Sequence, residues 1–497
     1  MLNIVTAAEM KAYDRFTIEQ VGLPSLLLME RAALEAVQVI LQQFHPHKVL
    51  IVAGGGNNGG DALAVGRILA EKGKTVTFFM PSLDGRITEE TLKQREVLLR
   101  LGFSIHNHFP KGEYDIVVDG LFGIGLSRAL EGIYLDTVAN INALKAKGAA
   151  IVSLDIPSGI CADSGRIMGD AVKADVTVTF QFPKAGHYFY PGKKYTGNLF
   201  VRSVGIVGEK HAKIPSSYLA FEDADLVVNL PERNPAGNKG TFGKVLLFAG
   251  SKDMCGAAVL CAKAVLRAGA GMVKIITCEE NRIIIQESIP EAMLYTYGET
   301  YDEKEIEKAL TWADVLIAGP GIGGGDTARR LLEKFLRQGQ KPFVIDADAI
   351  NLISKERNLK KLLKAYEPGK VIMTPHPGEF IRLTEKEMDE YLTAPETAVL
   401  EAAKEFQCIM VGKNATTLIA SYDTDRIYMN IFGNDGMATA GSGDVLAGII
   451  GGLLAQQREP MRAVITGVYL HAKAGEKAAD LKSNYGVTAG DMIESLW

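Results

Sequence analysis

The sequence has little cysteine and no excess of positive charge. Five cysteines (Cys161, Cys255, Cys261, Cys278 and Cys408) occur among 497 residues, and no two of them form a CxxC pair. An odd set without paired spacing argues against a disulfide framework, so we expect reduced, mostly buried thiols in a cytoplasmic protein. The net charge of −5 gives no sign of a surface that binds nucleic acid or an anionic membrane.

Long hydrophobic runs are also absent. The longest apolar stretch, VLAGIIGGLLA (445–455), is rich in glycine and much shorter than the ~20 residues that span a bilayer. The segment MLNIVTAAEMKAYDRF carries acidic residues early and lacks an uninterrupted apolar core. We therefore expect neither a membrane span nor a signal peptide.

What is present is an ordinary globular composition in two similar halves. Hydrophobic residues make up 47% of the chain and charged residues 23%, and the length favours two domains with separate cores. A stretch rich in Pro, Gly and polar residues covers 208–240, so we predict domains of 1–215 and 216–497. Each half opens with a strand, a glycine-rich loop and a helix.

The first half predicts a doubly wound α/β sheet. Lys48–Ala53 is a continuous apolar run of the kind that a parallel strand buried on both faces needs, and Lys74–Met80 is the next predicted strand. Because ligands bind at the carboxyl ends of such strands, Gly54–Asp61, Asp119–Arg128 and Asp155–Ser158 are expected at one rim.

The second half repeats this pattern. GKVLLFAGSKDMCGAAVLCAKAVLRAGAGMVKIIT again reads as strand, loop, helix and strand. The later runs DVLIAGPGIGGGD, PFVIDADAIN, VIMTPHPGEF and CIMVGKNATTLIAS each end in a Gly, Asp, His or Lys cluster. Polar groups are therefore expected at the carboxyl ends of strands here as well.

Several motifs in the first half admit two interpretations. GGGNNGGD (Gly54–Asp61) is either a tight strand–helix turn or a loop that approaches a phosphate or ribose, and no Gly-Lys-Ser/Thr follows it as in a Walker A loop. Asp155 in LDIPSG is an acid/base or a capping residue. Asp119 is a cation ligand or a structural carboxylate. Gly123–Leu130, with Arg128, suits phosphate, whereas Lys184 and His187 are expected to be surface loop residues.

The most specific signal in the second half is AGSGD, which ends at Asp444. An aspartate that takes a proton from a hydroxyl, beside N–H groups that hold a phosphate, is what phosphoryl transfer requires; a glycine-rich helix start is the alternative. Lys413–Thr417 offers a cation and hydroxyls, or a plain turn. His376 between two prolines favours a substrate contact. Gly319–Gly324 is a close-approach loop or a simple turn.

Taken together, these motifs resemble one family over essentially the whole chain. KGTFGKVLLFAGS, DADAIN, TPHPGE, KNATT and GNDGMATAGSGD resemble the ribokinase-like NAD(P)HX dehydratases, and GGGNNGGDALAVGR, DGLFGIGLSR and LDIPSGI resemble the NAD(P)HX epimerase domain. The resemblance implies repair of hydrated NADH and NADPH. An N-terminal Rossmann-like domain interconverts R and S NAD(P)HX, and a C-terminal domain dehydrates the S form with ADP, giving AMP and phosphate.

The resemblance also implies the site residues. Asp444 is the expected base of the dehydratase, and Asp155 is our choice for the epimerase acid/base. The epimerase substrate residues are Asn57, Asn58, Gly59, Gly60, Asp61, Gly123, Ile124, Gly125, Leu126, Ser127, Arg128, Ala129 and Asp155. The dehydratase substrate residues are Ala258, Gly321, Gly323, His376 and Asp444. The ADP residues are Lys413, Asn414, Ala415, Thr416, Thr417, Asn434, Ala440, Gly441, Ser442 and Gly443. The potassium ligands are Asn58, Asp119 and Ser158.

Two other functions fit parts of the sequence. A small-molecule kinase of the ribokinase type would use the same AGSGD chemistry, and an N-terminal domain of this kind can also serve as a nucleotide-binding module or scaffold. Asp119, Asp155 and the asparagine pair favour a working pocket, as does the lack of a basic patch. ADP is preferred over ATP only by resemblance, Mg²⁺ is expected with the nucleotide, and a homo-oligomer is expected from relatives.

Overall fold

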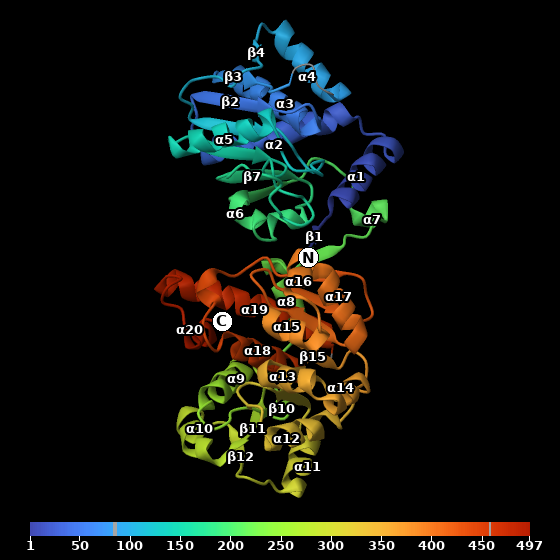
Figure 1. Ribbon diagram of the computed structural model, residues 1–497, viewed down its shortest axis with the longest axis vertical. Helices are drawn as coiled ribbons and strands as arrows, with labels where there is room; N and C mark the ends of the chain where they lie inside the picture. The colour runs from blue at the N-terminus through green and yellow to red at the C-terminus, as the bar shows by residue number, and fades with distance from the viewer. Residues whose placement is uncertain (83–86, 457–458) are drawn as a thin grey trace. The chain divides into compact units, whose positions relative to one another are not determined.

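The chain folds into two compact units. The computed structural model describes residues 1–82, 87–456 and 459–497. The N-terminal unit is Asn3–Tyr218, and the C-terminal unit is Leu219–Trp497 together with Met1–Leu2. Each unit is an α/β sheet covered by helices (Figure 1). No helix in the described ranges combines the length and the apolar composition that a bilayer crossing requires.

The N-terminal unit is a doubly wound parallel sheet, as predicted. Its strand order is β4-β3-β2-β5-β6-β7-β8, so the order reverses between β2 and β5. The strands are β2 (Lys48–Ala53), β3 (Thr75–Phe79), β4 (Ile105–His106), β5 (Ile116–Gly120), β6 (Ala150–Leu154), β7 (Val176–Phe180) and β8 (Asn198–Arg202). The helices are α1 (Ala7–Arg15), η1 (Phe16–Gln20), α2 (Ser25–Gln43), α3 (Asn57–Glu71), α4 (Glu89–Arg100), α5 (Ile133–Ala146), η2 (Ala185–His187), α6 (Gly192–Thr196) and α7 (Glu209–Ala212).

Successive side chains of β2 point to opposite faces of the sheet, and both faces are covered. Val49 and Ile51 pack into the core on one face, and Leu50 and Val52 pack into the core on the other. All four side chains are fully buried, which is the environment that a continuous apolar run predicts. Polar side chains are therefore left for the loops at the strand ends.

Strand register gathers those loops at the point where the strand order reverses. Ala53 of β2 lies opposite Gly120 of β5, and Asp119 of β5 lies opposite Ser153 of β6. The glycine loop, the Asp119 segment and the Asp155 segment therefore leave the sheet side by side. This is the position at which open α/β sheets bind ligands.

The C-terminal unit contains a larger sheet of the same class. From β9 onward its order is β9-β18-β17-β16-β15-β14-β13-β10-β11-β12. Along this order, each pair of neighbouring strands among β12, β11, β10, β13, β14, β15 and β16 is parallel. The pairs β16–β17 and β17–β18 are antiparallel. The strands are β1 (Leu2–Ile4), at the chain start, and β9 (Tyr218–Ala220), β10 (Lys244–Phe248), β11 (Met272–Cys278), β12 (Met293–Tyr297), β13 (Val315–Ala318), β14 (Phe343–Ile345), β15 (Val371–Met373), β16 (Ile409–Gly412), β17 (Leu418–Ser421) and β18 (Ile427–Met429).

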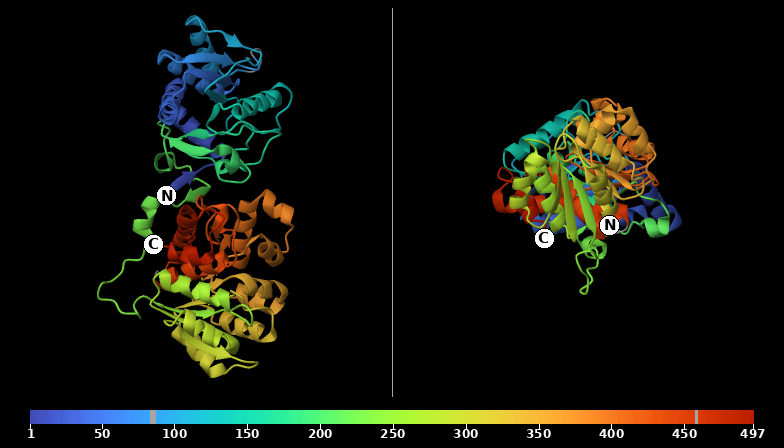
Figure 2. Two further views of the ribbon diagram at one scale, coloured as in Figure 1. Left: turned by 90° about the vertical axis from the view of Figure 1, so that its left-hand side faces the viewer. Right: turned by 90° about the horizontal axis from the view of Figure 1, so that it is seen from below.

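Helices enclose this second sheet. They are α8 (Asp223–Asn229), α9 (Cys255–Arg267), η3 (Glu279–Asn281), α10 (Arg282–Ser288), α11 (Glu303–Trp312), α12 (Asp326–Leu336), α13 (Ala347–Lys355), α14 (Arg357–Lys364), α15 (Pro377–Thr384), α16 (Met388–Thr393), α17 (Pro395–Phe406), η4 (Asp435–Met437), α18 (Ser442–Gln456), α19 (Pro460–Lys482) and α20 (Ala489–Glu494). The irregular segment 231–243, green in Figure 2, projects from the unit between α8 and β10.

The register of the C-terminal sheet again brings strand ends together. Ala318 of β13 lies opposite Ile345 of β14, which lies opposite Met373 of β15. The residues that follow these strands, including Asp346 and Thr374, therefore meet at one edge. Helix α18 starts beside that edge, and its apolar residues are buried against α9 and the sheet.

Candidate active sites

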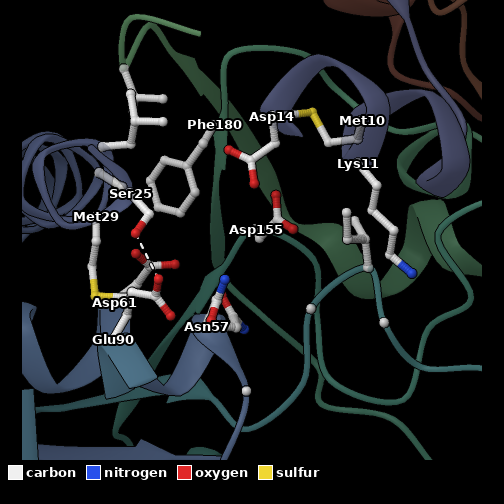
Figure 3. A pocket seen from close by; sticks show the side chains of 18 of the residues that line it. Met10, Lys11, Asp14, Ser25, Met29, Asn57, Asp61, Glu90, Asp155 and Phe180 are labelled. Carbon is white, nitrogen blue, oxygen red and sulfur yellow. Dashed lines mark hydrogen bonds between the residues drawn. The ribbon is translucent and has the colours of Figure 1, made fainter. Parts of the chain in front are cut away.

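The N-terminal unit contains a cavity of about 490 Å³ at the carboxyl ends of its strands. Helices α1 and α2 close it opposite the strand-end loops (Figure 3). The lining residues are Met10, Lys11, Asp14, Ile18, Ser25, Leu28, Met29, Ala32, Gly56, Asn57, Asn58, Asp61, Glu90, Leu121, Phe122, Gly123, Ile124, Gly125, Leu126, Asp155, Phe180, Lys184, Val204 and Ile206. A cavity of this size holds a small molecule or one end of a larger one.

The glycine loop that enters this cavity needs its glycines for close packing. A Cβ on Gly54 would lie 1.9 Å from the carbonyl oxygen of Leu121, and one on Gly59 would lie 1.9 Å from that of Gly54. Neither carbonyl can move without displacing backbone. The tight turn and the ligand-facing loop are therefore compatible interpretations, because Asn57, Asn58 and Asp61 of the same loop line the cavity.

Asp155 occupies an unusual position that neighbouring residues hold in place. Its φ of 64° lies in the left-handed region, which a side chain such as aspartate adopts when its surroundings enforce it. The Lys184 ammonium donates to Asp155 Oδ1 and, over 2.9 Å, to Thr179 Oγ1. Thr179 Oγ1 lies 3.2 Å from the same carboxylate oxygen.

His187 fixes the backbone of the same segment. The backbone N–H of Lys184 donates to His187 Nδ1 at 3.0 Å, so Nε2 carries the proton and donates to the Asp155 carbonyl oxygen at 2.8 Å. Burial lowers the pKa of His187 to about 4, and the Lys184 ammonium acts in the same direction. The ring therefore stays neutral.

The expectation that Lys184 and His187 are surface residues is wrong. Lys184 is fully buried and His187 is 1% exposed. Loop position alone suggested exposure, but the turn-rich segment folds back under the strand ends, where both side chains find buried partners. The ion pair with Asp155 was not detectable from sequence because 29 residues separate the two positions.

Carboxyl groups dominate the polar lining of the cavity. Asp14, Asp61, Glu90 and Asp155 all face it, and Ser25 donates to Glu90 at 2.6 Å (Figure 3). Burial, followed by the nearby Asp155 charge, raises the pKa of Asp61 well above its usual range. Burial and the Glu90 charge raise the pKa of Asp14 as well.

Sequence reasoning missed the wall that α1 and α2 contribute. Met10, Lys11, Asp14, Ser25 and Met29 all line the cavity. These residues belong to no glycine-rich or strand-end motif, so only the packing of two amphipathic helices over the sheet places them there.

Some of the expected epimerase residues lie outside the cavity lining. Gly59 and Gly60 are buried behind the loop, and Ser127, Arg128 and Ala129 lie on the segment that follows Leu126. The cavity is lined by Asn57, Asn58, Asp61, Gly123, Ile124, Gly125, Leu126 and Asp155 from the expected set.

The three expected potassium ligands meet in one buried cluster beside the cavity. Asp119 is fully buried and accepts from Ser153 Oγ at 2.8 Å, from Ser158 Oγ at 2.6 Å and from Ser158 N at 2.9 Å. Asn58 Nδ2 donates to the carbonyls of Phe122 and Leu154. Asn58 Oδ1 is buried without a hydrogen-bond partner in the part of the chain that the structure describes, which leaves an oxygen available to a cation.

The C-terminal unit presents a second group of polar residues at the start of α18. Asp346 is 1% exposed and its Oδ1 accepts from Lys413 Nζ at 2.7 Å and from Thr374 Oγ1 at 2.8 Å. A Cβ on Gly443 would lie 3.1 Å from Lys413 Nζ and 3.6 Å from Asp346 Oδ2. The glycine therefore brings the AGSGD backbone against this ion pair, next to Asp444.

The electrostatics of this group suit a general base. Burial raises the pKa of Asp444 to about 7, and the Asp346 charge acts in the same direction while Lys413 opposes it. Burial acts to lower the pKa of Lys413, but the carboxylates of Asp346 and Glu379 outweigh it, so the pKa is raised. Lys413 therefore stays cationic, and Asp444 titrates near neutral pH.

The GPGIGG loop uses glycine conformations that other residues avoid. Gly319, Gly321 and Gly323 all have positive φ, of 133°, 62° and 72°. A Cβ on Gly319 would lie 1.7 Å from the Asp346 carbonyl oxygen, and Gly323 N donates to Asp348 Oδ2 at 2.9 Å. The loop is thus anchored to the segment after β14.

Ala258 is fully buried in α9.

His376 performs a structural task in TPHPGE. Its Nδ1 accepts from Gly378 N at 3.0 Å, and its backbone N–H donates to Glu379 Oε2 at 2.9 Å, so it caps the start of α15. About half of the side chain remains exposed. Burial, together with the Lys413 charge, lowers the pKa of His376.

The remaining expected nucleotide residues lie in two loops. Asn434 caps η4 through Gly436 N at 2.9 Å, and Asn414 Oδ1 accepts from Ala415 N at 2.8 Å. Ser442 Oγ lies 3.2 Å from His471 Nε2, a buried histidine whose pKa burial lowers to about 4. The motifs DADAIN and TPHPGE contain Asp346 and Glu379, but the sequence alone gave neither residue a role, and His471 on α19 had no motif.

No cluster of three or more His, Cys, Asp or Glu side chains is arranged to hold a metal within the described ranges. The five cysteines are free thiols; four are buried and Cys161 is partly exposed. The prediction of mostly buried thiols is confirmed.

Comparisons with known proteins assign the chain to a family. The family model described as NAD(P)H-hydrate dehydratase matches residues 245–496, and that described as YjeF-related protein N-terminus matches residues 25–186. A ribokinase-like superfamily protein from Enterococcus faecalis V583 is 29% identical, with a TM-score of 0.50, covering 57% of this chain and 95% of that structure. The C-terminal fold is therefore ribokinase-like, as predicted.

Relatives match over the full length. The bifunctional NAD(P)H-hydrate repair enzyme Nnr of Thermofilum pendens is 34% identical and covers 100% of this chain and 95% of the relative. That of Moorella thermoacetica is 34% identical, covering 100% and 96%, and that of Escherichia coli K12 is 32% identical, covering 99% and 92%. The chain belongs to the family of bifunctional NAD(P)H-hydrate repair enzymes.

Proposed function

We propose that this protein repairs hydrated NADH and NADPH with two activities. The N-terminal unit interconverts the R and S epimers of NAD(P)HX, and the C-terminal unit converts the S epimer to NAD(P)H with ADP, releasing AMP and phosphate. The observation that carries this proposal is the match to bifunctional repair enzymes along the whole chain. Each unit has its own group of buried titratable residues, which supports a separate active site in each.

The dehydratase chemistry follows from the group around Asp444. A hydroxyl is a poor leaving group, and phosphorylation makes it a good one. Asp444 takes the proton of the NAD(P)HX hydroxyl while that oxygen attacks the terminal phosphorus of ADP, and AMP departs. Phosphate then leaves with the electrons of its carbon–oxygen bond, the neighbouring ring carbon loses a proton to solvent, and the ring double bond re-forms. The α18 N-terminus and the Lys413 ammonium stabilise the negative charge during transfer.

The binding residues of the dehydratase remain proposals by resemblance. NAD(P)HX is expected on Ala258, Gly321, Gly323, His376 and Asp444. ADP is expected on Lys413, Asn414, Ala415, Thr416, Thr417, Asn434, Ala440, Gly441, Ser442 and Gly443. Because Ala258 is fully buried, its part would be to shape the wall behind Gly250, where an added Cβ would lie 3.1 Å from Ala258 Cβ.

Mg²⁺ would be held mainly by the nucleotide. Magnesium in phosphate-transfer sites keeps several waters and uses few protein carboxylates, so a dedicated cage is not required. The charges of Asp346, Asp348 and Glu379 act on Asp444, so the electrostatics there would favour a cation carried by the nucleotide. The ion would neutralise phosphate charge.

The epimerase substrate is proposed to bind in the 490 Å³ cavity of the N-terminal unit. Asp155 is the proposed acid/base. Potassium fits the neighbouring cluster because Asn58 Oδ1 is a buried oxygen without a partner in the described ranges, and Asp119, Ser158 and the Phe122 carbonyl add oxygen donors. The ion would hold the glycine loop and the Asp119 and Ser158 loops in one arrangement.

We also propose that the protein is cytoplasmic and forms a homo-oligomer. Free, mostly buried thiols are compatible with a reducing compartment. Oligomerisation is expected from relatives and is measured directly by sedimentation velocity of the full chain.

The test follows the conversion of NADHX to NADH by absorbance. Both epimers are supplied with ADP, with ATP, or without nucleotide. Complete conversion with ADP is expected, because the dehydratase consumes only the S form and the epimerase replenishes it. Conversion that stops at the S fraction would exclude the epimerase. If NADHX is not converted and a small alcohol is phosphorylated instead, the protein is a small-molecule kinase.

A further inference from the structure

The carboxyl groups of the N-terminal cavity differ in their partners. Asp155 contacts the buried Lys184 ammonium, and Glu90 accepts from Ser25 at 2.6 Å. Asp61 has no hydrogen-bond or ion-pair partner among the residues of the described ranges. Two carboxyl groups in one cavity, one with a cation and one without, are a common arrangement for an acid and a base.

The surroundings favour the protonated form of Asp61. Its carboxyl is buried, and the charges that act on it most strongly, Asp155 and Asp14, are both negative. These causes raise the pKa of Asp61 well above its usual range, and Lys184 reverses only part of the effect. Asp61 therefore favours its protonated form more strongly than an ordinary aspartate does, while Asp155 forms an ion pair with Lys184.

The chemistry of hydrated dihydronicotinamide needs such a pair. The ring double bonds are conjugated with the ring nitrogen, so a proton adds to the carbon remote from nitrogen and water adds to the carbon bonded to it. The resulting hydroxyl therefore sits on a carbon bonded to nitrogen. Such a carbon changes configuration when its hydroxyl leaves as water and a new water adds from the opposite face.

We propose that Asp61 and Asp155 are the acid and the base of this exchange, with Lys184 as the positioning residue of Asp155. Asp61 gives its proton to the departing hydroxyl. The carbon–oxygen bond breaks, and the nitrogen lone pair forms a carbon–nitrogen double bond, giving a flat cation. Water then attacks the other face, Asp155 takes one of its protons, and the lone pair returns to nitrogen. The inference rests on the proposed epimerase activity.

The lining of the cavity suits the cationic intermediate. Carboxyl groups from α1, α3, α4 and the segment after β6 surround the space, so a transient positive charge is stabilised. The proton that Asp155 gained returns to Asp61 through solvent. In the reverse direction the two carboxyl groups exchange roles, as an enzyme acting on both epimers requires.

Lys184 controls which carboxyl is the base. Its ammonium contacts Asp155 and Thr179 and is held in a fully buried site, whereas Asp61 is beyond its hydrogen-bond reach. The backbone N–H of Lys184 also donates the hydrogen bond that orients the His187 ring under Asp155. Loss of the cation therefore removes the ion pair that holds the Asp155 carboxylate in place.

The experiment measures epimerisation of R-NADHX by the full chain without nucleotide, in water enriched in ¹⁸O. The variants are Asp61→Asn, Lys184→Met and Lys184→Arg, with Glu71→Gln as the matched control, since Glu71 is an exposed carboxyl at the end of the same helix as Asp61. Dehydration of S-NADHX with ADP by the same samples shows that the second site is intact, and circular dichroism shows whether the N-terminal unit of each variant is folded.

Asp61→Asn is expected to lower kcat by roughly 100-fold or more, the range typical of a lost acid. The wild-type rate falls as pH rises through the pKa of Asp61, and this limb is absent in Asp61→Asn. Lys184→Met lowers kcat because the buried cation that holds the Asp155 carboxylate in place is lost, and Lys184→Arg restores most of the rate. The charged groups facing Asp61 in these profiles are Lys11, Asp14, Glu90, Asp155 and Lys184.

The outcomes separate the two levels of the proposal. If the wild-type chain does not epimerise R-NADHX, the proposed function fails. If it does so and Asp61→Asn is equally active, or if the S product retains its original oxygen, the acid–base assignment is overturned while the function stands. Incorporation of ¹⁸O with loss of activity in Asp61→Asn supports it.

Discussion

At the scale of single residues, burial raises the pKa of carboxyl groups in both units. Asp444, Asp61 and Asp14 all have raised pKa values, and burial is the first cause in each case. The charge of Lys413 opposes the rise in the pKa of Asp444, whereas the charges of Asp155 and Asp14 add to the rise in the pKa of Asp61. These two settings suit the base that we propose in the C-terminal unit and the proton donor that we propose in the N-terminal unit.

The raised pKa of Asp444 predicts the pH dependence of the dehydratase. A base works only when ionised, so kcat/KM with ADP falls about tenfold per pH unit below about 7 and reaches a plateau above it. Asp444→Asn is expected to lower dehydration by at least about 10³-fold and to remove this limb. Initial rates on S-NADHX from pH 5.5 to 9 measure both effects, and unchanged epimerisation is the control.

The Asp346–Lys413 ion pair predicts a stability effect. Lys413→Met leaves a carboxylate that is 1% exposed with only Thr374 as its donor among the described side chains, which destabilises the fold by about 3 kcal/mol. Urea unfolding followed by tryptophan fluorescence measures this in the right unit, because Trp312 and Trp497 both belong to the C-terminal unit. The double variant with Asp346→Asn should recover most of the loss; a single-variant change below about 1 kcal/mol would contradict the pairing.

At the scale of elements, α18 carries Asp444 and is positioned by its close packing on α9. A Cβ on Gly448 would lie 2.3 Å from the carbonyl oxygen of Cys261, and one on Gly452 would lie 2.6 Å from that of Val265. Backbone thus meets backbone along this interface. The apolar run that is too short to cross a membrane is buried as the central helix of the C-terminal core.

Gly448→Ala is therefore expected to force α18 away from α9. The tryptophan-reported unfolding free energy should fall by about 1–3 kcal/mol, and dehydratase kcat should fall with it because Asp444 lies one turn away. The matched control is Gly256→Ala in α9, where a Cβ meets no atom within 4 Å, so stability should stay equal or rise slightly. Equal stability of the two variants would refute the packing role of Gly448.

At the scale of the whole molecule, two units with separate cores predict two unfolding transitions. ADP at 100 times its Kd should stabilise the C-terminal transition by about 2.7 kcal/mol and leave the N-terminal one unchanged. Circular dichroism reports both units and fluorescence only the C-terminal one, so the two curves should diverge as ADP is added. A shift of both transitions would show that ADP also binds, or acts on, the N-terminal unit.

Fusion of the two sites has a kinetic test of its own. One hypothesis is that a shared chain raises the local concentration of S-NAD(P)HX at the dehydratase. The two units divide between Tyr218 and Leu219, which gives the position for separate expression. Lower flux from R-NADHX to NADH in an equimolar mixture of the halves supports the hypothesis, and equal flux refutes it.

The order of residues alone was enough to predict the α/β class, the restart of the pattern in the second half, and the strand-end motifs. Apolar runs such as Lys48–Ala53 admit little except a buried parallel strand, and glycines before a helix mark the loops where ligands bind. Asn57, Asp61, Asp155 and Asp444 followed from these local patterns, because each lies within a few residues of its own strand or helix end.

The folded arrangement of the chain determines which side chains meet and in which direction each pKa is shifted. Lys184 and His187 were expected at the surface, yet the fold buries both beneath Asp155. Asp14 and Met29 reach the cavity because α1 and α2 pack over strand ends far along the chain. Pairing, burial and the resulting pKa shifts depend on distances through space, and a local pattern along the chain carries no record of them.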